Sequence, residues 1–125
     1  QNLRSLHWNV KGANFFELHL KYEELYSRTQ IIIDEVAERI LTIGTTPFSR
    51  FSDYLALSSI PENDLITEGK EGMTYILSAQ QVLLSLERSL MKQSVEFEDE
   101  GTNALLNDLV REKEKTNWMF TSWLG

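Results

Sequence analysis

The longest predicted helix of this sequence runs from Phe15 to Ile43 and reads FFELHLKYEELYSRTQIIIDEVAERILTI. We expect Asn14 to cap its first turn, with Glu17 completing a capping box, and Gly44 to end it. Residues at three- and four-residue spacing form a stripe that is expected to face the core. These residues are Leu18, Tyr22, Leu25, Thr29, Ile32, Val36 and Ile43.

A second stripe of the same helix also carries apolar residues, namely Phe16, Leu20, Ile31 and Leu41. A helix that is apolar on two faces is buried on two faces. A chain of 125 residues is large enough for only one core. We therefore predict that the second face contacts another copy of the chain.

Four potential metal ligands lie on this second stripe. At about 100° per residue they fall at roughly 0°, 40°, 60° and 100° around the helix, in the order His19, Glu23, Asp34 and Glu38. The midpoints of the two pairs are about 22 Å apart along the axis, which is too far for one metal site. An antiparallel two-fold axis near Arg28 and Thr29 would place the first pair of one subunit against the second pair of the other.

The two histidines of the chain are expected to lie at the same height of a helical hairpin. His7 precedes the turn at Gly12 by about one and a half helical turns, and His19 follows the next cap, Asn14, by a similar length. Antiparallel neighbours bring such positions together, so His7 joins His19 in the candidate site.

The rest of the chain also reads as helix. Residues 1–11 are expected to end a longer helix that begins before Gln1, and a short helix capped by Ser49 is expected over Phe48–Leu57. Two long helices should run from Thr67 to about Phe97 and onward from a cap at Thr102. The first of these helices has apolar residues at helical spacing, Met73, Ile76, Leu83 and Leu90, and a second set seven residues apart, Leu77, Leu84 and Met91. The inward face of the second helix is expected to carry Leu105, Leu109, Thr116, Met119 and Trp123. The prediction is a single all-α domain over residues 1–125, an antiparallel four-helix bundle with a short extra helix in its middle connection and a truncated first helix.

The composition of the chain limits the kinds of metal site and binding partner that it can have. The chain has no cysteine, so a metal would be held by imidazole and carboxylate groups, which favours iron, manganese or zinc. A net charge of -7 argues against general binding to the phosphate backbone of nucleic acids. No transmembrane segment and no signal-peptide pattern is present, so we expect no membrane partner and a cytoplasmic location.

A simpler interpretation of the polar residues stays open. Acidic residues four apart on a helix are usually solvated surface, and single histidines are more often structural than ligands. The acid run of Glu96, Glu98, Asp99 and Glu100 would by the same reasoning be a solvated loop. The other interpretation of this run is that it concentrates cations near an entrance route.

Longer motifs favour a metal site. In order along the chain they are His7-Trp8-Asn9-Val10-Lys11-Gly12, Asn14-Phe15-Phe16-Glu17-Leu18-His19, Asp34-Glu35-Val36-Ala37-Glu38-Arg39 and Trp118-Met119-Phe120. In these motifs the sequence closely resembles the Dps family of ferritin-like miniferritins. The resemblance implies a hollow dodecamer built from dimers, which oxidises ferrous iron, preferentially with hydrogen peroxide, and stores the ferric mineral.

The same resemblance implies a ferroxidase centre at each dimer interface. Its ligands would be His7, His19 and Glu23 of one subunit with Asp34 and Glu38 of the two-fold partner, and Trp8 would lie beside it. Ala104 stands where members often carry an acidic pore residue, so iron entrance is expected to use the Glu96–Glu100 run instead. Most of the family's first helix would precede Gln1, and the basic tail on which DNA binding usually depends is absent from this sequence.

Three function classes follow from these observations. The first is an enzyme and iron store, a ferroxidase that protects the cell from hydroxyl radical chemistry. The second is a structural or DNA-compacting assembly protein without turnover, and the third is a protein that binds a single metal, such as zinc. Anaerobic addition of ferrous iron followed by peroxide would separate them.

Overall fold

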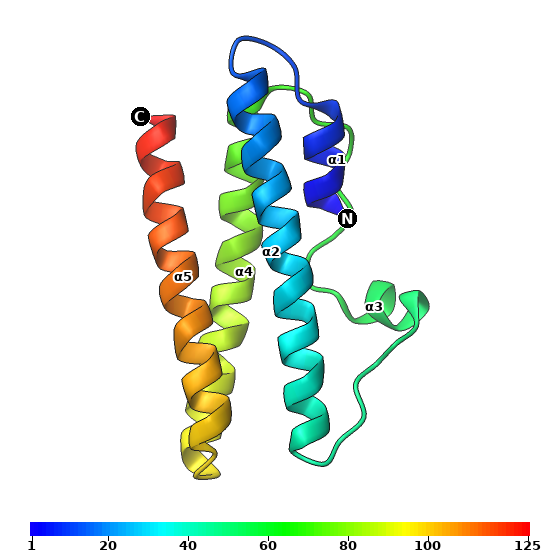
Figure 1. The fold of residues 1–125 in the computed structure, drawn as a ribbon, viewed down its shortest axis with the longest axis vertical. Coiled ribbons are helices and arrows are strands. Elements are labelled where there is room, and N and C mark those ends of the chain that lie inside the picture. Colours follow the sequence, from blue (N-terminus) through cyan, green and yellow to red (C-terminus); the bar gives the residue numbers. More distant parts are fainter. The chain divides into compact units, whose positions relative to one another are not determined.

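The predicted long helix forms α2, Phe15–Thr42, in the computed structural model, which describes residues 1–125 (Figure 1). Gly44 ends it as predicted, with a φ of 86° that favours glycine. The Gly44 N–H donates to the Leu41 carbonyl and the Thr45 N–H to the Ile40 carbonyl, at 2.9 and 3.1 Å. This pair of hydrogen bonds is a Schellman motif, which leaves Ile43 as the residue after the helix.

The helix α2 begins at Phe15 after Asn14, as predicted, but its first turn is closed differently. The Asn14 side chain makes no capping hydrogen bond, so the Asn14 half of the predicted capping box is wrong. A tight turn replaces it, in which the Phe15 N–H donates to the Gly12 carbonyl at 3.1 Å. Gly12 has a φ of 101°, which explains why a glycine is needed in this turn.

Four further helices complete the all-α chain in the predicted order. They are α1, Asn2–Asn9; α3, Phe51–Leu57; α4, Gly69–Glu96; and α5, Glu100–Leu124. The first ends two residues earlier than predicted, because Val10 takes an extended ψ of 141° and the Lys11 N–H donates to the Thr67 carbonyl. None of the five helices has both the length and the apolar character that a membrane crossing requires.

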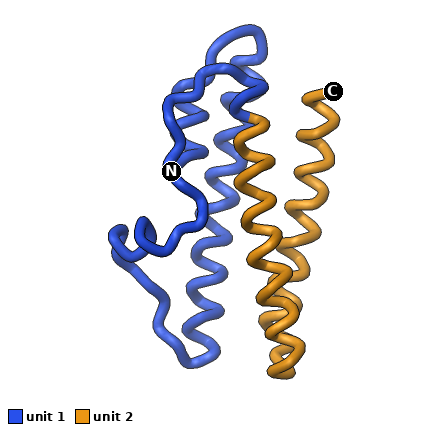
Figure 2. Tube along the Cα trace, turned by 180° about the vertical axis from the view of Figure 1, so that it is seen from behind, with its two compact units in different colours: residues 1–72 blue, residues 73–125 orange.

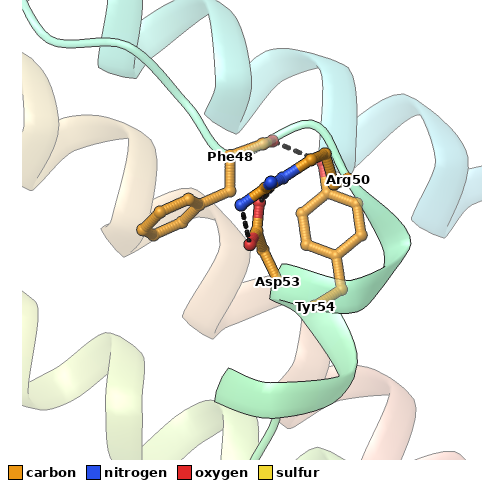
Figure 3. A network of polar contacts seen from close by, with 4 residues as sticks. All are labelled: Phe48, Arg50, Asp53 and Tyr54. Carbon is orange, nitrogen blue, oxygen red and sulfur yellow. Dashed lines mark hydrogen bonds and ion pairs between the residues drawn. The ribbon is translucent and has the colours of Figure 1, made fainter.

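The short helix α3 begins three residues later than predicted, and Ser49 does not cap it. Arg50 precedes its first turn and donates two hydrogen bonds to the Asp53 carboxylate, at 3.0 and 2.8 Å. Figure 3 shows this pair beside Tyr54, whose hydroxyl donates to the Phe48 carbonyl. Side-chain pairing within the first turn therefore takes the place of the predicted cap.

Carboxylate side chains cap the two longest remaining helices. Glu68 accepts from the N–H groups of Lys70 and Glu71, at 3.0 and 2.7 Å, so α4 begins after it. These hydrogen bonds lower the pKa of Glu68. At the other helix Asp99 accepts from the Thr102 N–H at 3.0 Å, so Asp99 is the cap of α5 and Thr102 is not.

The chain divides into two compact units, residues 1–72 and 73–125, coloured blue and orange in Figure 2. In the first unit α1 packs on α2 (Figure 1). Its buried apolar residues are Leu6, Val10, Leu18, Tyr22 and Ile66. That residues 1–125 form a single domain stays a prediction.

The second unit consists of most of α4 and all of α5. Arg88 pairs with Glu114 and Glu87 with Lys113, both at 2.7 Å, and Asn103 donates to the Met91 carbonyl and the Ser94 hydroxyl. Its buried apolar residues are Met73, Ile76, Leu84, Leu106, Leu109, Val110 and Phe120.

The predicted core faces are correct only in part. On α2, Leu18 and Tyr22 are buried but Thr29 is exposed, and Ile43, which follows the helix, is exposed as well. On α4, Leu83 and Leu90 are exposed, and on α5 only Leu109 of the predicted inner residues is buried. The buried face of α5 lies about one residue away from the predicted one, since Leu106, Val110 and Phe120 are buried while Leu105 and Met119 are more exposed.

Candidate metal centre

The two histidines lie against each other across the α1–α2 hairpin. Nδ1 of His7 is 2.7 Å from the carbonyl oxygen of His19, and Nδ1 of His19 is 2.8 Å from the carbonyl oxygen of His7. The two imidazole rings stack with their centroids 3.7 Å apart and their planes at 19°. The predicted equal height of His7 and His19 is thus confirmed.

These reciprocal hydrogen bonds determine which ring nitrogen is free. A carbonyl oxygen can only accept, so Nδ1 of each ring must carry the proton. In a neutral imidazole the other nitrogen, Nε2, then keeps its lone pair. Histidines that bind metals in proteins are typically held in this way, with one nitrogen on a carbonyl and the other on the metal. The pair therefore presents two metal-binding nitrogens, as a site of imidazole and carboxylate ligands requires.

Each histidine ring also contacts another aromatic ring. Phe15 stacks on His19 with centroids 5.1 Å apart, and Tyr26 meets the ring of His7 edge-on at 5.4 Å. The guanidinium of Arg4 lies over the Tyr26 ring, 5.2 Å from its centroid. His7 itself is only 8% exposed, so its ring is held among protein groups.

Tyr26 and Arg4 were not predicted to belong to this region. Helical spacing could have found both of them. Tyr26 is two turns beyond His19 on α2, and Arg4 is one turn before His7 on α1, so each shares a face with a histidine.

The predicted carboxylate ligands do not join the histidines within one chain. Glu23, Asp34 and Glu38 all lie exposed on α2, and no three acidic or histidine side chains of the chain gather into a metal-binding group. Because α2 is one unbroken helix, the separation of about 22 Å between its two ligand pairs holds. Their roles as ligands, and that of the exposed Trp8 as a neighbour of the centre, stay predictions.

The second apolar face of α2 is uncovered in the single chain. Phe16 is 81% exposed, and Leu20, Ile31 and Leu41 are each more than half exposed. Isolated apolar residues on a surface are ordinary, but a row of them along one helix marks an interaction site. The Asp34 and Glu38 carboxylates lie on this same stripe.

The acid run occupies the turn between α4 and α5. Glu96 ends α4, Glu98 has a φ of 57°, and Glu100 begins α5, all of them exposed. Asp99 instead caps α5 and also accepts from the Thr102 hydroxyl. The acid run therefore contains three exposed glutamates and one aspartate that caps a helix.

Comparison with known proteins gives consistent matches over the whole chain. The Ferritin family model, described as a ferritin-like domain, matches residues 1–125. "DNA protection during starvation protein 2" of Bacillus anthracis is 40% identical over 124 residues, which cover 98% of this chain and 84% of that protein. An uncharacterized protein of Haemophilus influenzae is 43% identical over 119 residues, 95% of this chain and 74% of that protein.

Solved structures match equally well. The crystal structure of a Dps protein from Vibrio cholerae O1 has a TM-score of 0.97 and 43% sequence identity, and the match covers 99% of this chain and 78% of that one. That protein is described as a member of a broad superfamily of ferritin-like diiron-carboxylate proteins. Dps from Bacillus brevis has a TM-score of 0.96 at 33% identity, covering 99% of this chain and 83% of that one.

Proposed function

Because this chain belongs to the Dps family of ferritin-like proteins, we propose that it is a ferroxidase that oxidises ferrous iron, preferentially with hydrogen peroxide. Membership confirms the predicted all-α, ferritin-like fold and indicates a general role in iron storage and protection. The diiron-carboxylate description of the Vibrio cholerae relative supports iron as the metal. We extend the proposal to storage of the ferric mineral inside a hollow homo-oligomer, a dodecamer built from dimers, in the cytoplasm.

The observation that carries the proposal is the reciprocal hydrogen bonding of the histidines. It leaves Nε2 of His7 and of His19 free to bind iron. In the proposed centre Glu23 completes the ligands of one subunit, and its two-fold partner contributes Asp34 and Glu38. Two imidazoles with carboxylates are a ligand set that ferrous iron accepts.

Two ferrous ions in one centre would suit hydrogen peroxide as the oxidant. Reduction of one hydrogen peroxide to two waters takes two electrons and two protons, and two ferrous ions in one centre supply both electrons. No one-electron reduction product is then released. The residues of the chain bind and orient the two ions, and the carboxylates balance the positive charge that increases on oxidation.

A structural or DNA-compacting protein without turnover is the alternative. Several relatives are named for DNA protection during starvation, and these names support the alternative. The net charge of -7 weighs against contacts with DNA phosphates. Binding of a single zinc ion without turnover is the third hypothesis.

Anaerobic titration with ferrous iron, followed by peroxide and read by the optical absorbance of ferric iron, separates these functions. We expect oxidation of about two ferrous ions per peroxide, as paired metal ions in one centre require. His7→Ala should lose most of this oxidation, whereas Ser27→Ala, an exposed change on α2, should behave as wild type. Metal binding without oxidation would favour the single-metal protein, and no binding would favour the structural one.

A further inference from the structure

The ring of Tyr26 contacts two side chains on one face of α1. It meets the His7 imidazole at 80°, with 5.4 Å between centroids, and it receives the Arg4 guanidinium on its face at 5.2 Å. Arg4 and His7 are three residues apart on α1, so Tyr26 reaches across from α2 to both. A cation over a tyrosine face and an edge-to-face ring pair are each attractive, so they fix the Tyr26 ring together.

The hydrogen bond of His7 leaves its imidazole ring free to make one movement, a tilt. The bond to the His19 carbonyl anchors the edge that carries Nδ1. The ring can still tilt about that edge, and Nε2 on the far side of the ring would then move most. The stacked ring of His19 limits the tilt on one face. The contact with Tyr26 is the second ring contact of His7, and it limits the remaining movement.

We propose that Tyr26, held in place by Arg4, is a positioning residue that sets the direction of the His7 Nε2 lone pair. This inference rests on the proposed function, since it assumes that His7 binds a metal. Tyr26 acts through its ring and not through its hydroxyl, because the ring makes both contacts. Phe15 has the equivalent place on His19, but its second ring contact is with Phe16, the next residue of α2, and no residue of α1 holds it as Arg4 holds Tyr26.

Cobalt(II), alone and without oxidant, is the probe that tests this role, because its visible absorption reports on the geometry of its ligands. The dissociation constant for Co(II) is measured on the intact assembled protein, and the thermal unfolding midpoint is measured without metal. We expect Tyr26→Leu to weaken Co(II) binding by about tenfold, at the low end of the loss for an outer partner of a metal ligand. Tyr26→Phe, which keeps the ring, should restore wild-type affinity, and Arg4→Gln should give an intermediate loss.

The control variant is Tyr54→Leu on α3, which removes a tyrosine ring that has no contact with either histidine. It should leave Co(II) affinity unchanged. Wild-type affinity in Tyr26→Leu would overturn the inference, and so would a loss that Tyr26→Phe does not restore. If Tyr26→Leu does not fold, Arg4→Gln decides the question, because wild-type Co(II) affinity in that variant also overturns the inference.

Failure of the proposed function gives a different pattern. If His7→Ala binds Co(II) as tightly as wild type, the metal does not bind to His7 at all. That result overturns the ferroxidase proposal together with this inference, whereas a failure confined to the Tyr26 variants leaves the ferroxidase proposal intact.

Discussion

Gly72 allows the first turn of α4 to approach Tyr22 closely. A Cβ placed on Gly72 would lie 2.7 Å from the Tyr22 hydroxyl oxygen and 3.3 Å from a methyl carbon of Leu6. Both neighbours are fully buried, so neither can move away cheaply. Gly72→Ala should therefore lower the free energy of unfolding by about 1–3 kcal/mol, as overpacking of a core does, measured by urea unfolding.

Removal of the Tyr22 hydroxyl is the matched test of this explanation. Tyr22→Phe loses one long hydrogen bond to the Gly69 carbonyl, 3.5 Å, and should cost little alone. In this background the penalty of Gly72→Ala should fall by more than half, because the nearest clashing atom is absent. Additive effects of the two changes would show that the clash is not the cause.

The phenol of Tyr22 also predicts how stability changes in alkali. Burial, and secondly the nearby Glu68 carboxylate, raises its pKa from 10.0 to about 12. The folded chain therefore holds this proton more tightly than the unfolded chain, and the contribution to stability is complete below about pH 10 and lost as the pH rises to 12. Urea unfolding between pH 9 and 12 should show a smaller decline for Tyr22→Phe than for wild type. Equal declines would contradict the prediction.

Single residues were predictable where one geometric rule determines their place. The hairpin about Gly12 brings His7 and His19 together whatever their chemistry, so spacing was sufficient. Helix caps were less predictable, because neighbouring side chains compete for the same N–H groups and similar local energies decide between them. Asp99 therefore caps α5 where Thr102 was expected.

At the scale of helices, the sequence predicted the number and order of the helices correctly, but it predicted less well which face of each helix is buried. Long periodic segments specify a helix strongly, but the buried side of α5 depends on which neighbours cover it. Leu106 and Val110 are buried there instead of Leu105 and Thr116. The sequence predicted the ligand pairs of the candidate centre, but a single chain cannot test Asp34 and Glu38, because a second copy would have to supply them.

The turn between α4 and α5 gives a prediction about iron uptake. We expect the exposed glutamates of the acid run to raise the local concentration of ferrous iron, since clustered negative charge focuses the potential. A variant with Glu96→Gln, Glu98→Gln and Glu100→Gln keeps the Asp99 cap of α5. It should take up iron more slowly than wild type at low salt and nearly as fast at high salt, measured by stopped-flow absorbance. Equal slowing at both would contradict the electrostatic role.

At the scale of the whole molecule, the uncovered face of α2 predicts a two-fold contact between chains. Leu20→Glu or Ile31→Glu would place two buried charges in each contact, because a two-fold axis repeats the substitution. Native mass at micromolar concentration should fall to that of a monomer for these variants. Lys21→Gln, which lies about 100° away from Leu20 around the same helix, should leave the native mass unchanged. A wild-type protein that is monomeric would contradict the predicted contact.

His19 and Asp34 lie 15 residues apart on one helix and are nevertheless proposed to serve one centre. His19→Ala and Asp34→Ala should each lose most peroxide-dependent iron oxidation, because every centre of a homodimer then lacks a ligand. In a mixed dimer one centre carries both defects, and the other combines an intact His19 with an intact Asp34. Refolding the two variants together should therefore restore about a quarter of wild-type activity for random pairing and about half for fully mixed dimers. If mass analysis shows mixed dimers that remain inactive, the two residues do not meet across the interface, and the proposed centre is wrong.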